Sequence, residues 1–322
     1  MRDTDRWRRG TFVVEHTPRL WALWAASRPS QLALVLLVYL LGVGIASAGP
    51  PVTGASVTTD RTDLARSVLR GALALVPVTV TIHYANEYAD RETDALTDPT
   101  PFSGGSGALV RTGLPASFLR RATVAAFIAA VFVVLVTVRL GLGRDALALL
   151  AAIALFGLAY SLPPFALIRR GLGEVTNAAL GGIALPLYGV SVVGAPTPAT
   201  VLVTLPFALV VGCNLLATPW PDRRADATVG KRTLAVRWSP DRLRLTYSVL
   251  AVSAAVFTVG LWIGGLLPNV VALAHLVPVP ALVWGGVVLT RQRSPFPAVA
   301  AMVLLAAATT AAWWWVGFGG TA

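Results

Sequence analysis

Long runs of apolar residues alternate with short polar segments along the whole chain. Within the runs Ala, Val and Leu follow one another without the two-residue alternation of a half-buried strand, so we predict helices. A helix needs about 20 apolar residues to cross the hydrocarbon core of a bilayer, whereas a strand of a membrane barrel needs about 9 to 11. Nine runs have roughly the length of a membrane-crossing helix: residues 31–48, 69–84, 122–138, 146–162, 175–193, 200–216, 247–266, 270–289 and 298–318.

This pattern predicts an all-α fold, a polytopic membrane helical bundle with nine transmembrane helices. None of the polar segments has the length or low complexity of a linker between soluble domains, so residues 1–322 are predicted to form one membrane domain. Carboxylates four positions apart occur in two of the polar segments, which predicts an internal duplication. Its halves are residues 28–172 and 173–290, followed by a ninth helix at residues 298–318.

Composition excludes an ordinary water-soluble globule, because 56% of the residues are hydrophobic and only 13% are charged. The formal net charge is +11. Cytoplasmic loops of membrane proteins retain Lys and Arg, and an N-terminus in the cytoplasm with the C-terminus outside places 21 of the 26 basic residues on the cytoplasmic side. The remaining five are Arg61, Arg66, Arg70, Arg139 and Arg144. The charge therefore indicates topology and contact with anionic membrane lipid, and we expect no nucleic-acid partner.

Two further features bear on the cellular context. Ala46-Ser47-Ala48 follows the first apolar run and resembles a signal-peptidase site. We expect no cleavage there, because the basic segment before the run and the run itself are both longer than those of a signal peptide. Cys213 is the only cysteine, so the sequence predicts neither an intramolecular disulfide nor a thiolate metal cluster.

The first carboxylate motif follows the second apolar run. Asn86, Asp90 and Asp94 are spaced by four residues, so they share one face if the helix continues through them. Oxygen ligands suit Mg²⁺, which takes one or two carboxylates and completes its octahedron with water and phosphate oxygens. The motif therefore predicts a metal-bridged diphosphate at the end of an apolar helix.

The second motif follows the sixth apolar run and combines both signs of charge. Asp222 and Asp226 are again spaced by four, and Lys231 and Arg232 follow within a few residues. This combination suits a site where a metal holds a diphosphate and a cationic side chain neutralises its leaving oxygens. The alternative is a solvated loop with local salt bridges. Two such motifs on one face of a nine-helix bundle favour the metal site.

A third polar segment, residues 160–174, begins with Tyr160 and Ser161 and passes through paired prolines that end the fourth helix. Arg169 and Arg170 follow, on the predicted side of the two Asp motifs. They serve either as phosphate ligands or as charged anchors at the membrane interface, and composition leaves both open.

Other polar and aromatic features have simpler interpretations. Residues 103–107 are rich in Gly and Ser but lack the Lys-Ser/Thr of a phosphate-binding P-loop, so we predict a flexible loop. His83 is predicted to be a satisfied interior residue rather than a base. Tryptophans near both ends of the chain predict interfacial aromatic belts: Trp7, Trp21, Trp24, Trp313, Trp314 and Trp315.

Together these motifs resemble those of the UbiA superfamily of intramembrane prenyltransferases. The resemblance covers most of the chain and implies nine transmembrane helices around a central cavity, two Mg²⁺ ions held by the two Asp motifs, and a lateral opening for a lipid tail. It rests on Arg28-Pro29, on Asn86-x-x-x-Asp90-x-x-x-Asp94, on Tyr160-Ser161, and on Asp222-x-x-x-Asp226 before Lys231.

Within the superfamily, residues 170–174 and 230–237 are most similar to the dihydroxynaphthoate prenyltransferases of menaquinone, hence quinone, biosynthesis. Two features depart from that pattern. Thr218 stands one turn before Asp222 where Asn is common, in a helix interrupted by prolines, and residues 97–110 lack the arginines that often follow the first motif. Other acceptors therefore stay open: a glyceryl ether phosphate, a carotenoid or a tetrapyrrole.

The resemblance implies Mg²⁺-assisted ionisation of an allylic diphosphate to a carbocation, which a lipophilic acceptor attacks. The implied partners are an isoprenoid diphosphate, that acceptor and membrane lipid. The implied catalytic and metal-holding residues are Asp90, Asp94, Asp222 and Asp226, with Asn86 as a further metal ligand. The implied substrate-binding residues are Asn86, Tyr160, Ser161, Arg169, Arg170, Lys231 and Arg232.

A secondary transporter is the competing class, because repeated halves and intramembrane carboxylates can bind a cation and its substrate. Transporters place these charges near the bilayer midplane. The two Asp motifs instead fall at the ends of the second and sixth predicted helices, so we predict an enzyme.

Overall fold

The computed structural model describes residues 16–49, 61–97, 102 and 105–320 of the chain. Within these residues nine helical stretches are long and apolar enough to cross a membrane, which confirms the predicted all-α membrane bundle. They are Pro18–Ser47, Thr62–Leu96, Ala116–Arg139, Arg144–Ser161, Gly173–Val193, Pro198–Ala217, Pro240–Ile263, Asn269–Val288 and Phe296–Gly317. The internal duplication stays a prediction.

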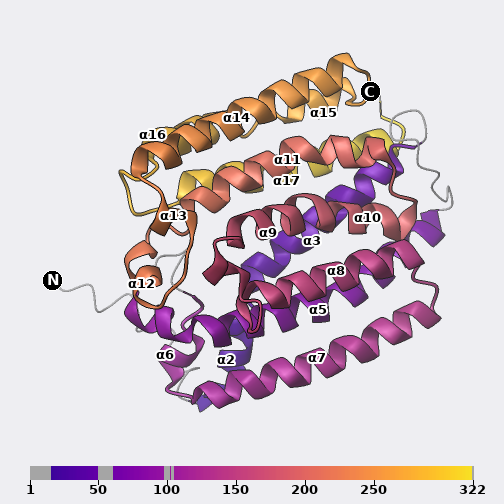
Figure 1. Cartoon of the computed structure of the whole chain (residues 1–322). Helices are drawn as coiled ribbons and strands as arrows, with labels where there is room; N and C mark the ends of the chain where they lie inside the picture. The colour runs from indigo at the N-terminus through magenta and orange to yellow at the C-terminus, as the bar shows by residue number, and fades with distance from the viewer. Residues whose placement is uncertain (1–15, 50–60, 98–101, 103–104, 321–322) are drawn as a thin grey trace.

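The long helices lie side by side across Figure 1, and several short helices lie together at the left of the view. The helices of nine residues or more are α2 (Pro18–Ala26), α3 (Pro29–Ser47), α5 (Arg61–Leu96), α7 (Ala116–Arg139), α8 (Arg144–Ser161), α10 (Leu185–Val193), α11 (Pro198–Ala217), α14 (Pro240–Ile263), α16 (Val279–Val288) and α17 (Phe296–Gly317). The shorter elements are α6 (Ala108–Thr112), a 3₁₀ turn (Leu167–Arg170), α9 (Gly173–Ala179), a π-helical turn (Leu180–Ala184), α12 (Arg223–Thr228), α13 (Leu234–Arg237) and α15 (Asn269–Ala274). We call the side where α6, α12 and α13 lie the motif end, because α5 also finishes there with the first Asp motif (Figure 1).

Proline and small hydroxyl residues mark where many of these helices begin. Proline occupies one of the first two positions of α3, α11 and α14, where its missing N–H leaves no intrahelical bond unmade. Thr197 caps α11 by accepting a hydrogen bond from the Thr200 amide at 3.2 Å. Arg28 separates α2 from α3 in the left-handed region, at a φ of 51°.

The second and the eighth runs differ most from the prediction. The second run was expected to span residues 69–84, but α5 continues from Arg61 to Leu96, because its polar ends are still helical. The eighth run was expected to be one helix, yet it divides into α15 and α16 around residues 275–278. Pro278 and Pro280 supply no amide for a continuous helix through this stretch, which accounts for the division.

Glycine allows a close approach of two helix backbones between α3 and α10. A Cβ built on Gly42 would lie 1.8 Å from the Pro186 carbonyl oxygen, and one on Gly189 would lie 2.2 Å from the Tyr39 carbonyl oxygen. Small residues let helix backbones meet in this way, where side chains would hold them apart. Tyr188 then donates its hydroxyl to the Gly71 carbonyl at 2.7 Å, which ties α10 to α5.

The aromatic belt prediction is wrong for part of the cluster in α17. Trp313 is only 1% exposed and belongs to the core. Trp314 donates its indole N–H to the Leu40 carbonyl at 2.9 Å, so it also faces the neighbouring helix. Trp315 is 57% exposed and keeps the orientation expected of a belt residue. Trp7 lies outside the described residues.

Candidate functional site

The first motif lies in the last turns of α5. This helix carries Asn86, Asp90 and Asp94 without interruption, so the three side chains are one turn apart, as predicted. Ser161, at the end of α8, donates its hydroxyl to the Asn86 side-chain oxygen. The structure therefore connects the first motif to the start of the third polar segment.

His83, one turn before Asn86, is buried and bonds through Nδ1 to the Ser27 carbonyl at 2.7 Å, which confirms its predicted interior role.

The second motif lies just beyond the end of α11. That helix stops at Ala217, and Asp222 is the N-cap of α12, one turn before Asp226. The Asp226 amide donates to the Asp222 carbonyl at 2.9 Å, which places the two acidic residues on successive turns. The side chain of Asp226 is 6% exposed. Burial raises the pKa of this carboxyl above its ordinary value, and Lys231 opposes that rise.

Lys231 joins the two motifs. Its ammonium nitrogen lies 2.9 Å from Asp90 Oδ1 and 3.2 Å from Asp226 Oδ1. The Lys231 side chain is 8% exposed, and burial by itself would lower its pKa. The carboxylates of Asp90 and Asp226 outweigh burial and raise the pKa, so the ammonium stays charged. The second motif is therefore no solvated loop, because its acidic group and its cation are both buried against α5.

A second buried ion pair borders the first motif. Glu87 is 3% exposed, and Arg28 donates to its Oε1 through Nε at 2.7 Å. Ser106 donates its amide to Glu87 Oε1 at 3.0 Å and its hydroxyl to Oε2 at 2.6 Å. A Cβ on the neighbouring Gly105 would lie 2.1 Å from Asp94 Oδ2, so the loop backbone packs directly on Asp94.

Glu87 and Arg28 were not predicted as site residues. A spacing of four residues identifies Asn86, Asp90 and Asp94 as one face of a helix, and Glu87 lies outside that face. Arg28 was noted only as part of an Arg-Pro pair. The predicted loop at residues 103–107 is described only from Gly105, and Ser103 and Gly104 lie outside the described residues.

The remaining predicted site residues lie at the motif end with other partners. Arg169 donates to the Val229 carbonyl and Arg170 to the Pro164 carbonyl, each at 2.9 Å, and both side chains are exposed. Arg232 is exposed as well, while its amide donates to the Ile168 carbonyl at 3.1 Å. Tyr160 packs near the backbone of Gly173, because a Cβ there would lie 3.3 Å from its ring. The structure thus brings Lys231 to the carboxylates and keeps the three arginines at the surface.

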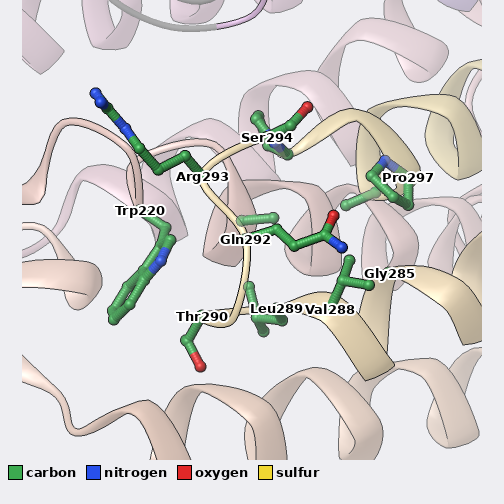
Figure 2. Close-up of a pocket in the computed structure, with 12 residues that line it drawn as sticks. Trp220, Gly285, Val288, Leu289, Thr290, Gln292, Arg293, Ser294 and Pro297 are labelled. Carbon is green, nitrogen blue, oxygen red and sulfur yellow. The ribbon is translucent and has the colours of Figure 1, made fainter. Parts of the chain in front are cut away.

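A small hollow lies beside Trp220, between the turn after α11 and the loop from α16 to α17. Figure 2 shows the Gln292 side chain across it and Arg293 pointing away. Its volume is about 10 Å³, which is room for roughly one water molecule. The hollow is therefore too small to be a substrate cavity.

The fold and the site define a class: a polytopic helical membrane protein whose charged centre lies at one end of the bundle. The model of the UbiA prenyltransferase family matches residues 47–308. The chain belongs to this family and is an intramembrane prenyltransferase. Comparison with curated protein sequences finds no match.

Solved structures share the fold at low sequence identity. A UbiA homologue from Archaeoglobus fulgidus, bound to GPP and Mg²⁺, is 16% identical, with 92% of this chain and 99% of that chain covered and a TM-score of 0.62. An apo UbiA homologue from Aeropyrum pernix K1 is 15% identical over 86% and 96% of the two chains, with a TM-score of 0.63. A digeranylgeranylglyceryl phosphate synthase is 15% identical over 92% and 99%, with a TM-score of 0.61.

Proposed function

We propose that the chain transfers a prenyl group from an isoprenoid diphosphate to a lipophilic acceptor, with Mg²⁺ as cofactor. The observation that carries this proposal is the position of Lys231, whose ammonium contacts one carboxylate from each Asp motif. Segments far apart in the chain thus present acidic groups to one cation at the end of a membrane bundle. Carboxylates from two segments beside a buried cation suit a diphosphate that arrives with bound metal.

The residues present fit Mg²⁺. Asp90, Asp94, Asp222 and Asp226 offer carboxylate oxygens, and Asn86 offers an amide oxygen, so each motif would hold one of two expected ions. Among the described residues no three His, Cys, Asp or Glu side chains gather tightly enough to hold a metal by themselves. Mg²⁺ tolerates this, because it takes few carboxylates and retains water and phosphate oxygens as ligands. When bound, the metal would supply positive charge that stabilises the departing diphosphate.

Lys231 would neutralise the leaving group from the protein side. Its charged ammonium is already at the junction of the motifs, and a diphosphate arriving with metal would exchange the Asp90 and Asp226 contacts for phosphate oxygens. The surrounding apolar helices exclude water, which would otherwise consume an allylic cation. Arg169, Arg170 and Arg232 would attract the diphosphate from the surface.

The structural neighbours support the substrate class. Homologues from Archaeoglobus fulgidus have been solved with GPP and Mg²⁺ and with DMAPP and Mg²⁺. We propose that this chain likewise takes an isoprenoid diphosphate, of a chain length that product analysis will define. Family membership also sets the transporter alternative aside.

For the acceptor we propose dihydroxynaphthoate, and hence a place in quinone biosynthesis, on the pattern of residues 170–174 and 230–237. A glyceryl ether phosphate is the second candidate, because one neighbour of similar fold is a digeranylgeranylglyceryl phosphate synthase. A carotenoid or a tetrapyrrole would complete an acceptor panel.

The test is product formation by the purified protein in lipid nanodiscs. Geranylgeranyl diphosphate and each acceptor would be supplied with Mg²⁺, and products identified by mass spectrometry. We expect prenylated dihydroxynaphthoate, loss of product with a chelator, and recovery on returning Mg²⁺. Product from a different acceptor alone would overturn the naphthoate assignment, and activity indifferent to chelator would overturn the metal assignment.

A further inference from the structure

We propose that Glu174 is a positioning residue that holds Lys231 at the junction of the two Asp motifs. This inference rests on the proposed function, because it assigns Glu174 a role through Lys231 in diphosphate binding. Glu174 is the second residue of α9 and lies outside both carboxylate motifs. It does not contact Lys231 in any hydrogen bond or ion pair of the described residues, so it acts through the backbone between them.

Lys231 needs a fixed backbone to reach both carboxylates. Its side chain is only 8% exposed, so close packing prevents its rotatable bonds from following a shift of the main chain, and such a shift would move the ammonium away from Asp90 or Asp226. The backbone at this point is the turn between α12 and α13, where the Lys231 amide donates to the Asp226 carbonyl at 2.9 Å. That bond ties Lys231 only to α12. The part of the turn that leads into α13 therefore needs contacts from another segment.

The segment between α8 and α9, together with the first turn of α9, holds the turn on both sides of Lys231. Before it, the Val229 carbonyl accepts from Arg169 at 2.9 Å. After it, the Arg232 amide donates to the Ile168 carbonyl at 3.1 Å. Further on, the Leu234 amide donates to Glu174 Oε1 at 2.6 Å.

Of these three contacts, the one from Glu174 is a buried side-chain contact. Arg169 is exposed, so water competes for its bond, and the bond from Ile168 is made by main chain alone. Glu174 is 9% exposed, and a short hydrogen bond to a carboxylate is among the stronger ones in a protein. The geometry therefore makes Glu174 the side chain best placed to set the position of the turn.

Stability alone does not account for a carboxylate here. The second oxygen of Glu174, Oε2, is buried and has no hydrogen-bond partner among the described residues, and the same holds for the hydroxyl of Thr233. An unpaired buried polar atom disfavours folding, and an apolar side chain of similar size would remove this atom but leave the Leu234 amide without its acceptor. We infer that the carboxylate is kept for the placement of Leu234, and through it of Lys231.

The experiment compares Glu174→Leu, which loses the acceptor, with Glu174→Gln, which keeps an oxygen for the Leu234 amide. The probe is geranylgeranyl thiolodiphosphate with Mg²⁺, a slowly reacting analogue, and its Kd is measured alongside the steady-state kcat and KM. Glu174→Leu is expected to weaken analogue binding and raise the diphosphate KM by about tenfold, while Glu174→Gln stays within about threefold of wild type. Asp241→Leu is the matched control, since it removes an 89% exposed carboxylate near the same end of the bundle.

A double-mutant cycle separates positioning from general damage. If Glu174 acts through Lys231, adding Glu174→Leu to a Lys231→Gln background changes the Kd by no more than about twofold. Equal losses in both backgrounds, or a glutamine variant as weak as the leucine variant, would overturn the inference. If Lys231→Gln itself leaves the Kd unchanged, the proposed diphosphate contact of Lys231 fails, which is a different result. Should Glu174→Leu not fold, Glu174→Met takes its place in the same cycle.

Discussion

At the residue scale, two buried groups of oppositely charged side chains lie at the motif end. Lys231 lies between Asp90 and Asp226, and Arg28 lies against Glu87. Removing one partner of such a pair costs about 3 to 5 kcal/mol, because the remaining charge is left buried without compensation. Burying these charges also costs free energy of desolvation, so the pairs are expected to have a function beyond stability.

The Asp motifs give the first prediction. Asp90→Asn and Asp222→Asn each remove a charge that would hold metal while the shape of the side chain is kept. We expect each variant to lose at least about 100-fold in kcat, since even outer-shell changes at metal sites cost 10- to 100-fold. The measurement is prenyl transfer by protein that still elutes as a folded species in detergent. A variant with wild-type turnover would contradict the role of that motif in metal binding.

The basic residues give a second prediction. It rests on a difference in burial, because Lys231 is buried against carboxylates whereas Arg169 and Arg170 are exposed. Lys231→Gln should raise the apparent KM for the prenyl diphosphate by about 10- to 150-fold, because a hydrogen bond to a charged group contributes about 1.5 to 3 kcal/mol. Arg169→Gln and Arg170→Gln remove exposed groups that already donate to backbone carbonyls, so smaller increases are expected.

Both apparent affinities should be measured for these three variants, with dihydroxynaphthoate and with a neutral acceptor. An arginine variant that loses affinity for the naphthoate alone would assign that guanidinium to the acceptor carboxylate. Equal effects of all three variants on the diphosphate would contradict the separation drawn from their burial.

At the element scale, close packing of α3 on α10 brings together the first and the fifth of the membrane-crossing stretches. Gly42 and Gly189 meet where no Cβ fits, while Tyr39 and Tyr188 pack at 5.6 Å between ring centroids. Lipid tails provide no hydrophobic drive between helices, so contact of this kind has to come from van der Waals packing and hydrogen bonds. The two glycines are therefore expected to be structural.

Gly42→Ala tests this packing. The added methyl group would meet the Pro186 carbonyl, so we expect a loss of about 1 to 3 kcal/mol of stability. Gly260→Ala, in α14, is the matched control, because a Cβ there meets nothing within 4 Å. It should be neutral or stabilising by up to about 1 kcal/mol, since alanine favours helix over glycine. Unfolding temperatures in one detergent compare them, and equal values would contradict the close approach.

At the scale of the whole molecule, the bundle gathers every predicted site residue of the described chain at one end. The membrane orientation of that end is a prediction from charge, because the topology predicted from the sequence assigns 21 of the 26 basic residues to the cytoplasmic side. We expect the motif end to face the cytoplasm.

Cysteine labelling at the two ends of α7 tests the orientation in a Cys213→Ala background. Arg120 is exposed at the motif end of this helix, and Gly143 follows its other end with open space for a side chain. Arg120→Cys should resist a membrane-impermeant reagent applied to intact cells, and Gly143→Cys should react with it. The reverse labelling pattern would contradict the topology.

The sequence predicts the large-scale architecture correctly for a specific physical reason. Membrane crossing demands long apolar helices with satisfied backbones, so helix number and order follow from hydropathy alone. The four-residue spacing of Asn86, Asp90 and Asp94 likewise depends only on helix geometry, and α5 carries them as predicted. Boundaries were less accurate, because the polar ends of α5 are helical without being apolar.

Other features depend on contacts between distant segments and could not be predicted. Trp313 has the composition of a belt residue, yet the packing of α17 on α3 buries it. Glu87 and Glu174 have no spacing signal, and their importance arises from Ser106 and Leu234, which the fold brings to them.

By itself, the sequence determined the nine membrane-crossing stretches of the described residues and the helical spacing of the first acidic motif, because solvation by lipid and helix periodicity act locally along the chain. It also carries the pattern that the UbiA family model matches over residues 47–308. Only the tertiary structure decided that Lys231, rather than Arg169 or Arg170, connects those motifs. It also decided that Glu174 holds the turn on which Lys231 lies. The physical reason is that burial and hydrogen bonding select among similar charged residues only after the helices have packed, since desolvation depends on neighbours that the local sequence does not specify.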